Sequence, residues 1–132
     1  MKTIGSVKED LSVEKRISIT PDAVKKFTEL GFSINIEKKY AEHLGISDED
    51  YKRNGANINF SKEEVFEKSE IILRVNCLSD NEVGFIKSKS ILIGQFDPNL
   101  NKDIVNKLIK NDIKIFSLNL LPRITRAQSM DV

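Results

Sequence analysis

The sequence predicts an α/β domain in which helices cover both faces of a parallel sheet. Three observations lead to this expectation. Short apolar, strand-like runs alternate along the chain with amphipathic, helix-like runs. The length of 132 residues suits one domain with a core of its own. No internal repeat, low-complexity tract or linker interrupts the alternation. A repeated β-α-β order is typical of a parallel sheet.

Six runs have the patterns of strands. Some alternate between apolar and polar residues, which indicates one buried face. The run at 70–75 holds Ile71, Ile72, Leu73 and Val75, the pattern of a buried strand. The six runs cover residues 3–7, 32–36, 56–60, 70–75, 90–93 and 113–118. Pro122 then breaks the apolar pattern.

The first two helices are predicted by their end signals. Thr20 can cap a helix, Pro21 fits the first turn, where no N–H is needed, and Gly31 is placed to end the helix. Ser61 and Glu64 have the spacing of a capping box that opens the second helix.

The remaining helical signals are shorter or less regular. Residues 40–54 are acidic and mixed, which predicts short helical turns with Gly55 as a stop, and residues 80–86 could form a short helix. Asn99 can cap a further helix. The apolar stripe of that helix would consist of Ile104, Val105, Leu108 and Ile109.

Composition excludes several kinds of protein. The formal net charge is +1, so no excess of basic residues indicates a nucleic-acid partner or an anionic membrane surface. Cys77 and His43 are the only residues of their kinds, which rules out an internal disulfide and argues against a metal centre. No signal peptide is present, and every apolar run is far shorter than the ~20 residues that span a bilayer. Any role at a membrane must therefore come through a partner.

Dinucleotide-binding and phosphate-binding glycine motifs are also missing. The six glycines are scattered singly, and the first strand leads into Lys8-Glu9-Asp10 rather than a glycine turn. This segment is therefore neither a Rossmann unit nor a P-loop.

A few side chains outside the last loop are candidates for a site. Arg16, in Glu14-Lys15-Arg16, either belongs to a solvated loop or lies near a cleft at the end of the first strand. Arg74 interrupts an apolar strand, so it needs a partner or a strand end open to water. His43 is expected to be a surface histidine, and Cys77 a small buried or half-buried residue.

The most informative stretch is the last one, from Pro122 to Asp131. It groups two arginines, a glutamine and an aspartate behind a strand, where α/β proteins often place ligand contacts. Arg123 and Asp131 could pair, which would orient the guanidinium toward a planar amide or a phosphate. The alternative is a helix start with ordinary surface charges. A domain rarely stops where such a loop begins, so we expect a fragment of a longer protein.

This last stretch resembles the Arg-Gln-Asp loop of the NAD(H)-binding component of proton-translocating nicotinamide nucleotide transhydrogenase. The opening, residues 4–21, is similar to the start shared by transhydrogenase alpha subunits and alanine dehydrogenases. Residues 31–32, 51–56 and 69–76 fit the same pattern. The resemblance therefore runs the length of the chain, and its terminal loop is specific to the transhydrogenase branch.

The resemblance implies a flavodoxin-like parallel sheet and a place in a two-domain component. Residues 1–132 would form the alanine dehydrogenase/transhydrogenase N-terminal-like domain, and the Rossmann NAD-binding domain would follow it across an NAD(H) cleft. By position, Arg123 and Asp131 would orient the nicotinamide end of NAD(H), and Gln128 would reach toward the NADP(H)-binding partner. No side chain of the chain would act as a catalytic acid or base, and none would bind a metal.

The resemblance also implies an activity and partners. The full enzyme, a Re/Si-specific NAD(P)+ transhydrogenase, would couple hydride transfer between NAD(H) and NADP(H) to proton translocation. Its partners would be the NADP(H)-binding component and the membrane subunit, with a homodimer in the full protein. The chain would lie in the cytoplasm, peripheral to the inner (plasma) membrane, and the fragment alone would be inactive.

Two alternatives stay open. The chain could be the substrate-side domain of an alanine or saccharopine dehydrogenase-like enzyme, or a free-standing α/β binding domain. Arg74 stands where the alanine dehydrogenase pattern has lysine, and residues 91–98 contain no histidine. Both departures count against an amino-acid dehydrogenase. Arg74 also departs from the lysine common in transhydrogenases.

Overall fold

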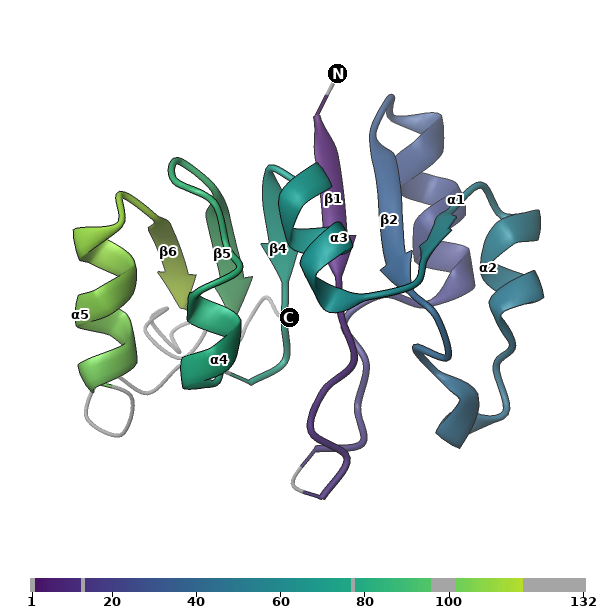
Figure 1. Ribbon diagram of the computed structural model, residues 1–132. Helices are drawn as coiled ribbons and strands as arrows, with labels where there is room; N and C mark the ends of the chain where they lie inside the picture. Colours follow the sequence, from purple (N-terminus) through teal and green to yellow (C-terminus); the bar gives the residue numbers. More distant parts are fainter. Residues whose placement is uncertain (1, 13, 77, 96–101, 118–132) are drawn as a thin grey trace, which may run out of the picture.

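The computed structural model describes residues 2–12, 14–76, 78–95 and 102–117 (Figure 1). In this part of the chain six strands form one sheet, and every pair of neighbours is parallel. The strands are β1 (Thr3–Ser6), β2 (Ser33–Glu37), β3 (Asn57–Asn59), β4 (Ile71–Leu73), β5 (Ile91–Gly94) and β6 (Lys114–Ser117). The helices are α1 (Pro21–Glu29), the 3-10 turn η1 (Glu42–Leu44), α2 (Asp48–Arg53), α3 (Lys62–Lys68), α4 (Asp80–Val83) and α5 (Lys102–Lys110).

The strand order is β3-β2-β1-β4-β5-β6. Without the three-residue edge strand β3, this is the 2-1-3-4-5 order of flavodoxin-like sheets. The prediction of an α/β, flavodoxin-like parallel sheet is therefore confirmed, and the short extra strand expected within 56–60 lies at the edge. Between β1 and β4 the direction of strand addition reverses, and this is where open α/β sheets bind ligands.

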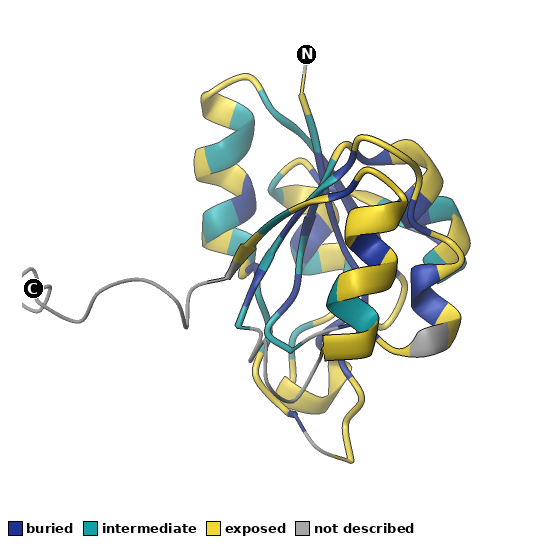
Figure 2. Ribbon diagram, turned by 90° about the vertical axis from the view of Figure 1, so that its left-hand side faces the viewer, coloured by how far each residue is buried: buried dark blue, intermediate teal, exposed yellow. Residues whose placement is uncertain are grey.

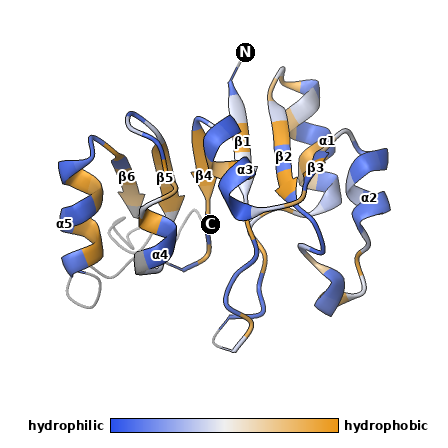
Figure 3. Ribbon diagram, viewed as in Figure 1, coloured by the Kyte–Doolittle hydropathy of each residue, from blue (hydrophilic) through white to orange (hydrophobic). Residues whose placement is uncertain are grey.

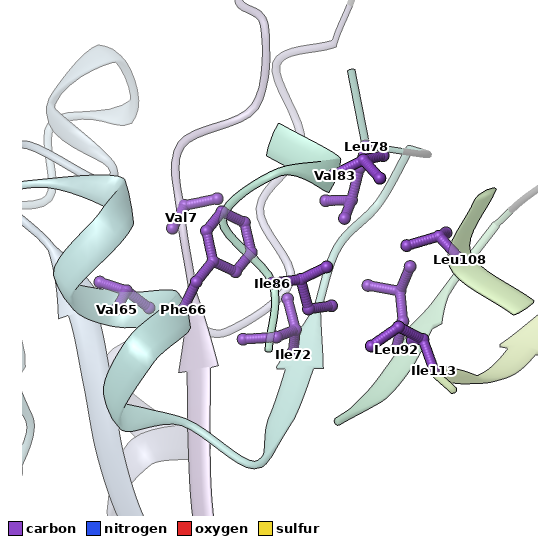
Figure 4. Packing of buried hydrophobic residues seen from close by; sticks show 10 residues of the cluster. All are labelled: Val7, Val65, Phe66, Ile72, Leu78, Val83, Ile86, Leu92, Leu108 and Ile113. Carbon is purple, nitrogen blue, oxygen red and sulfur yellow. The ribbon is translucent and has the colours of Figure 1, made fainter. Parts of the chain in front are cut away.

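Helices lie on both faces of the sheet. In Figure 1, α3, α4 and α5 lie in front of the sheet and α1 lies behind it, beside β2. The front core, seen from close by in Figure 4, joins these three helices to β4 and β5. It contains Val7, Val65, Phe66, Ile72, Leu78, Val83, Ile86, Leu92, Leu108 and Ile113. The rear core contains Ile4, Ile19, Val24, Ile34, Ile36, Tyr40, Ala41, Tyr51 and Ala56, so it joins α1 and α2 to β1 and β2.

Helix ends follow the predicted side-chain signals closely. The Thr20 hydroxyl accepts a hydrogen bond from the N–H of Ala23, with Pro21 in the first turn. Ser61 likewise accepts from the N–H of Glu64, but the Glu64 carboxylate accepts from Phe60 instead of Ser61. The capping box predicted there is therefore only half formed.

Two other details differ from the expectation. Ile109, part of the apolar stripe predicted for α5, is 61% exposed, so that stripe is only partly buried. Only one side of α5 meets the sheet, and Leu108 occupies that side. The fourth strand ends at Leu73, not at Val75, so Arg74 follows the strand instead of interrupting it. None of the helices in the described ranges has the length and apolar character needed to cross a bilayer.

Candidate functional site

The candidate site lies at the carboxyl edge of the sheet, where the loops after β1, β4 and β5 converge. These loops bring together side chains from residues 8–19, 74–79 and 95. Because all strands are parallel, their carboxyl ends share one edge, and the reversal between β1 and β4 opens a gap between the loops there. The position of this site follows from strand order alone.

The loop after β1 is held at its far end by buried tyrosines. The Tyr40 hydroxyl oxygen accepts hydrogen bonds from the N–H groups of Ser18 (3.0 Å) and Ile19 (3.4 Å). Ser6 Oγ donates to the carbonyl of Leu73 at 2.7 Å, so in the 2.8 Å contact between Tyr40 and Ser6 the tyrosine hydroxyl is the donor. Tyr40 therefore ties the loop to the ends of both β1 and β4.

Two further side chains hold the same loop. The Tyr51 hydroxyl donates to the carbonyl of Ile19 at 2.8 Å, and its ring packs edge-on against Tyr40. Burial raises the pKa of both tyrosine hydroxyls, so they stay protonated and keep these bonds. His43 Nε2 lies 2.8 Å from the carbonyl of Lys15. These contacts fix residues 15 to 19, at the far end of the loop after β1.

Arg16 is the exposed cation of this loop, and Glu14 orients it. Arg16 Nε and Nη2 donate to the two Glu14 carboxylate oxygens at 2.7 and 2.9 Å, which is a bidentate fork. Asn76, from the loop after β4, donates to Glu14 at 3.2 Å. The hydrogen bonds from Arg16 lower the pKa of Glu14 to about 2. The fork leaves Arg16 64% exposed, with Nη2 3.5 Å from the side-chain oxygen of Gln95.

Arg74 lies deeper and is fully engaged by carboxylates. Its guanidinium is 4% exposed, with Nη1 2.7 Å from Glu82 and Nη2 3.4 Å from Glu9. Lys62, the first residue of α3, adds a second cation 2.9 Å from Glu82. The charges of two carboxylates, Glu9 and Glu82, and of two cations, Arg74 and Lys62, therefore balance beneath the site. Arg74 faces this network, and its Nε and Nη1 also donate to the carbonyls of Asn76 and Lys8.

The two carboxylates of this network respond oppositely to their surroundings. Burial raises the pKa of Glu9 and outweighs the attraction of Arg74. Burial also acts on Glu82, but Arg74, the N–H of Ser79 and Lys62 together outweigh it, so the pKa of Glu82 is lowered. Glu9 accepts the N–H groups of Val75 and Asn76, which joins the loop after β1 to the loop after β4. The network lies beneath the loops after β1 and β4 and holds them in fixed positions relative to each other.

Two cavities flank Arg74. One of about 360 Å³ lies between Arg16, Ile17 and Ser18 on one side and the ends of β4 and β5 on the other. The Ser18 hydroxyl beside it is buried and has no hydrogen-bond partner among the described residues. The other, of about 920 Å³, lies above the ionic network. Its lining residues are Glu9, Asp10, Lys62, Arg74, Asn76, Ser79, Asn81, Glu82, Gly84 and Phe85.

The sequence-predicted residues divide into three groups. Arg16 lies at a cleft, as its functional interpretation required, and Arg74 has the buried partners that a buried arginine needs. His43 is exposed, as predicted, but it also bonds the loop that carries Arg16. The cofactor-binding candidates Arg123, Gln128 and Asp131, and also Cys77, lie outside the described residues.

Sequence reasoning missed the residues that support the site. Glu9, Tyr40 and Asn76 carry no motif, because their partners lie 34 to 67 residues away in the chain. The spacing of Glu14 and Arg16 is the one local signal that could have been used, since a carboxylate two residues before an arginine can form a fork with it. Among the described residues, no group of three or more His, Cys, Asp and Glu side chains is placed to hold a metal ion.

Comparison with known proteins identifies the family. Residues 5–132 match the family described as "Alanine dehydrogenase/PNT, N-terminal domain". The chain belongs to this family.

The relatives of this chain include both transhydrogenases and alanine dehydrogenases, the two branches that the sequence suggested. An NAD(P) transhydrogenase alpha subunit of Rickettsia prowazekii is 31% identical over 97% of this chain and 34% of its own length. A transhydrogenase structure from Sinorhizobium meliloti superposes with a TM-score of 0.89 at 29% identity, covering 98% of this chain and 39% of that one. An alanine dehydrogenase of Methanococcus maripaludis is 34% identical over 80% of this chain and 30% of its own length.

The extent of these matches separates the two branches. The similarity to transhydrogenase alpha subunits covers nearly the whole chain, and the similarity to the alanine dehydrogenase covers less of it. This chain therefore corresponds to the N-terminal part of transhydrogenase alpha subunits, with alanine dehydrogenase as the secondary similarity. It spans about a third of the length of these curated relatives.

Proposed function

We propose that this chain is the N-terminal part of the NAD(H)-binding component of a proton-translocating NAD(P) transhydrogenase. The complete, Re/Si-specific enzyme would transfer hydride between NAD(H) and NADP(H). The observation that carries the proposal is the similarity to transhydrogenase alpha subunits over 97% of the chain. A Rossmann domain elsewhere in the polypeptide would hold the cofactor pyrophosphate. Residues 1–132 alone would then bind NAD(H) weakly or not at all and be inactive.

The described residues fit one wall of a nicotinamide nucleotide cleft. The cavity beside Arg16 has about 360 Å³, within the range of small-ligand sites. The Ser18 hydroxyl, which has no partner in the described part of the chain, and the exposed Arg16 guanidinium offer polar contacts at the rim of the cavity. Leu73 and Ile93 supply an apolar floor. A planar ring with one polar substituent suits such a lining.

The terminal loop would complete the site. In this proposal Arg123 and Asp131 orient the nicotinamide carboxamide, and Gln128 reaches toward the NADP(H)-binding partner. The nicotinamide rings supply the hydride chemistry, so the protein needs no general acid or base. What the chain contributes is positioning, because transfer requires the two rings at near-attack distance and correct orientation. Guanidinium and amide donors suffice for that task.

The proposed assembly follows from the same relationship. The chain would function with an NADP(H)-binding component and a membrane subunit, as a homodimer in the full protein. It would lie in the cytoplasm, held at the inner (plasma) membrane by those partners, which would couple the reaction to proton translocation.

Gln128→Asn in the intact enzyme tests the proposal. The substitution keeps the amide but withdraws it by about 1.5 Å, one carbon–carbon bond, and a misplacement of ~1 Å can cost ~100-fold in rate. Stopped-flow hydride transfer should therefore slow strongly, while NADH affinity barely changes, because the pyrophosphate contacts lie on the other domain. Equal loss of rate and affinity would make Gln128 a simple binding residue, and no loss of either would refute its role.

The alanine dehydrogenase similarity supports a second candidate, an NADH-dependent reductive amination of a 2-oxo acid. Arg16 at the cavity rim is the observation that favours it, since a guanidinium can bind a carboxylate bidentately. NADH oxidation by the intact protein, in the presence of ammonium and pyruvate but without NADP+, would decide for this candidate. Oxidation that requires an NADP+ analogue would decide against it.

A further inference from the structure

The loop after β1 extends beyond the sheet, so the side chain of Arg16 depends on hydrogen bonds for its position. Figure 2 shows that this loop reaches below the strands and is largely exposed at its tip. Figure 3 shows that the loop is largely hydrophilic, whereas the strands above it are largely hydrophobic. Tyr40, Tyr51 and His43 bond to backbone atoms of residues 15–19. The guanidinium of Arg16 is therefore positioned by other contacts.

The fork between Arg16 and Glu14 does not by itself place the guanidinium in the site. Nε and Nη2 of Arg16 donate to the two carboxylate oxygens of Glu14, but the two residues lie two positions apart in the same loop. The fork sets the orientation of Arg16 relative to its own loop. The distance from Arg16 to the strand ends on the opposite wall of the 360 Å³ cavity depends on a contact between the fork and the sheet.

Asn76 makes this contact from the loop after β4. Its Nδ2 donates to Glu14 Oε1 at 3.2 Å, and the same oxygen accepts from Arg16 Nη2 at 2.9 Å. The hydrogen bonds from Arg16 lower the pKa of Glu14 to about 2, so the carboxylate is ionised and can only accept. Asn76 must therefore present its NH₂ group. Arg16, Glu14 and Asn76 form a chain of charge-assisted hydrogen bonds from the cavity rim to the end of β4.

The backbone of Asn76 is held independently of its side chain. Its N–H donates to Glu9 at 3.3 Å, and its carbonyl accepts from Arg74 Nε at 3.3 Å. The N–H of Val75 also donates to Glu9, at 2.8 Å. Removal of the side-chain amide of Asn76 would leave these backbone contacts in place. An effect on the fork can therefore be separated from an effect on the fold.

We propose that Asn76 is a positioning residue, which acts through Glu14 to hold the Arg16 guanidinium at a fixed distance from a bound nicotinamide nucleotide. This inference rests on the proposed function, in which the 360 Å³ cavity is one wall of the NAD(H) cleft. Arg16 is the group that would meet the carboxamide or a phosphate oxygen of the cofactor, since a guanidinium binds either one. Asn76 lines the larger cavity on the other side of Arg74, so it would not touch the cofactor itself.

Asn76→Ala in the intact enzyme removes the donor and tests the proposal. Hydride transfer should slow by about tenfold or more, because a misplacement of ~1 Å can cost ~100-fold in rate. NADH affinity should stay within about twofold of wild type, because the pyrophosphate contacts lie on the other domain. Asn57→Ala is the matched control and should leave both quantities unchanged, since Asn57 is exposed on β3 at the far edge of the sheet.

Asn76→Asp adds a pH readout that a purely structural role would not produce. The introduced carboxyl group can donate to Glu14 only while it is protonated. Glu14 is its closest charged neighbour, with Glu9, Arg16 and Arg74 around it, so the pKa of the introduced group should be raised. Relative to wild type, transfer should be slowest near pH 8 and recover as the pH falls toward 5. The deficit of Asn76→Ala should not change with pH.

A double-mutant cycle with Arg16→Met shows whether Asn76 acts through Arg16. If it does, Asn76→Ala should add no more than about twofold to the loss that Arg16→Met causes. Fully multiplicative losses would overturn the proposal. It would also be overturned if Asn76→Ala transferred hydride at the wild-type rate, if it lost rate and NADH affinity equally, or if the deficit of Asn76→Asp did not depend on pH.

A measurement without turnover separates this inference from the proposed function. If the wild-type enzyme transfers no hydride between NADH and an NADP+ analogue, the proposed function fails whatever Asn76 does. NMR titration of the Glu14 carboxyl group in the 132-residue chain still tests the contact. Asn76→Ala should raise the pKa of Glu14, because it removes one donor to the carboxylate. An unchanged pKa would overturn the positioning role.

Discussion

Replacing Arg74 by methionine should destabilise the domain through the charges that it leaves behind. The methionine fills much of the same space, so the cavity penalty is small. What changes is the neighbourhood of Glu9 and Glu82, whose side chains are 2% and 7% exposed. Removing one partner of a buried ion pair typically costs about 3–5 kcal/mol, because the other charge remains buried.

The structure places this variant at the lower end of that range. Glu82 keeps Lys62 at 2.9 Å and the N–H of Ser79 at 2.9 Å. Glu9 keeps the N–H groups of Val75 and Asn76 but loses its cation. We therefore expect a loss of about 3 kcal/mol in the free energy of unfolding at pH 7, which corresponds to a fall of roughly 1–2 M in the urea midpoint.

The pH dependence gives this prediction its sharpest check. The pKa of Glu9 is already raised in the folded protein, and without Arg74 it should rise further. A carboxyl group with a raised folded-state pKa opposes folding as the pH rises through that value, and protonation at lower pH removes the penalty. The stability difference between variant and wild type should therefore shrink as the pH falls from 7 to 5.

Urea unfolding followed by circular dichroism at pH 7, 6 and 5 measures the effect. Arg53→Met is the matched control, because Arg53 is 68% exposed and pairs with Asp50 on the surface. It should change the stability by less than about 1 kcal/mol at any of these pH values. The reasoning is refuted if Arg74→Met is no worse than Arg53→Met, or if its deficit grows as the pH falls.

Two further predictions concern packing and acid stability. Gly5→Ala should lower the free energy of unfolding by about 2–3 kcal/mol, because a methyl group there would lie 2.2 Å from Ser69 Oγ and 2.7 Å from Val65. Gly84→Ala is the control and should be neutral or stabilising, because the nearest neighbour of its methyl group would be 3.5 Å away. Equal urea midpoints for the two variants would contradict the close contact of β1 with α3. The pKa of Glu14, about 2, is below its ordinary value, so its contribution to stability is present above about pH 4.5 and is lost as the pH falls toward 2. Glu14→Gln should therefore lower the unfolding temperature at pH 7 and make that temperature fall less steeply between pH 5 and 2. If the unfolding temperatures of variant and wild type fall in parallel with pH, the Arg16 fork does not contribute to stability.

The sequence by itself determined the elements and the sheet type. Thr20 and Ser61 set helix starts through hydrogen bonds that reach only three residues along the chain, so they could be read without knowing the fold. The apolar runs located all six strands to within one or two residues, with the largest difference at the carboxyl end of the fourth. The terminal loop suggested the family, which comparison with known proteins then showed. The roles of Arg123, Gln128 and Asp131 stay predictions.

Only the tertiary structure decided which side chains meet. Local signals predicted that Arg74 needs a partner but could not name Glu9, which lies 65 positions earlier in the chain and approaches only when β1 and β4 become neighbours. The pairing of β1 with β4 also brings Asn76 to Glu14 and Ser6 to Leu73. Helical spacing places Ile109 in the apolar stripe of α5, but Ile109 is exposed, because the width of the contact depends on where the helix lies on the sheet. The pattern along the chain sets what each element is, and strand order sets what it touches, because strand order alone decides which loop ends share an edge.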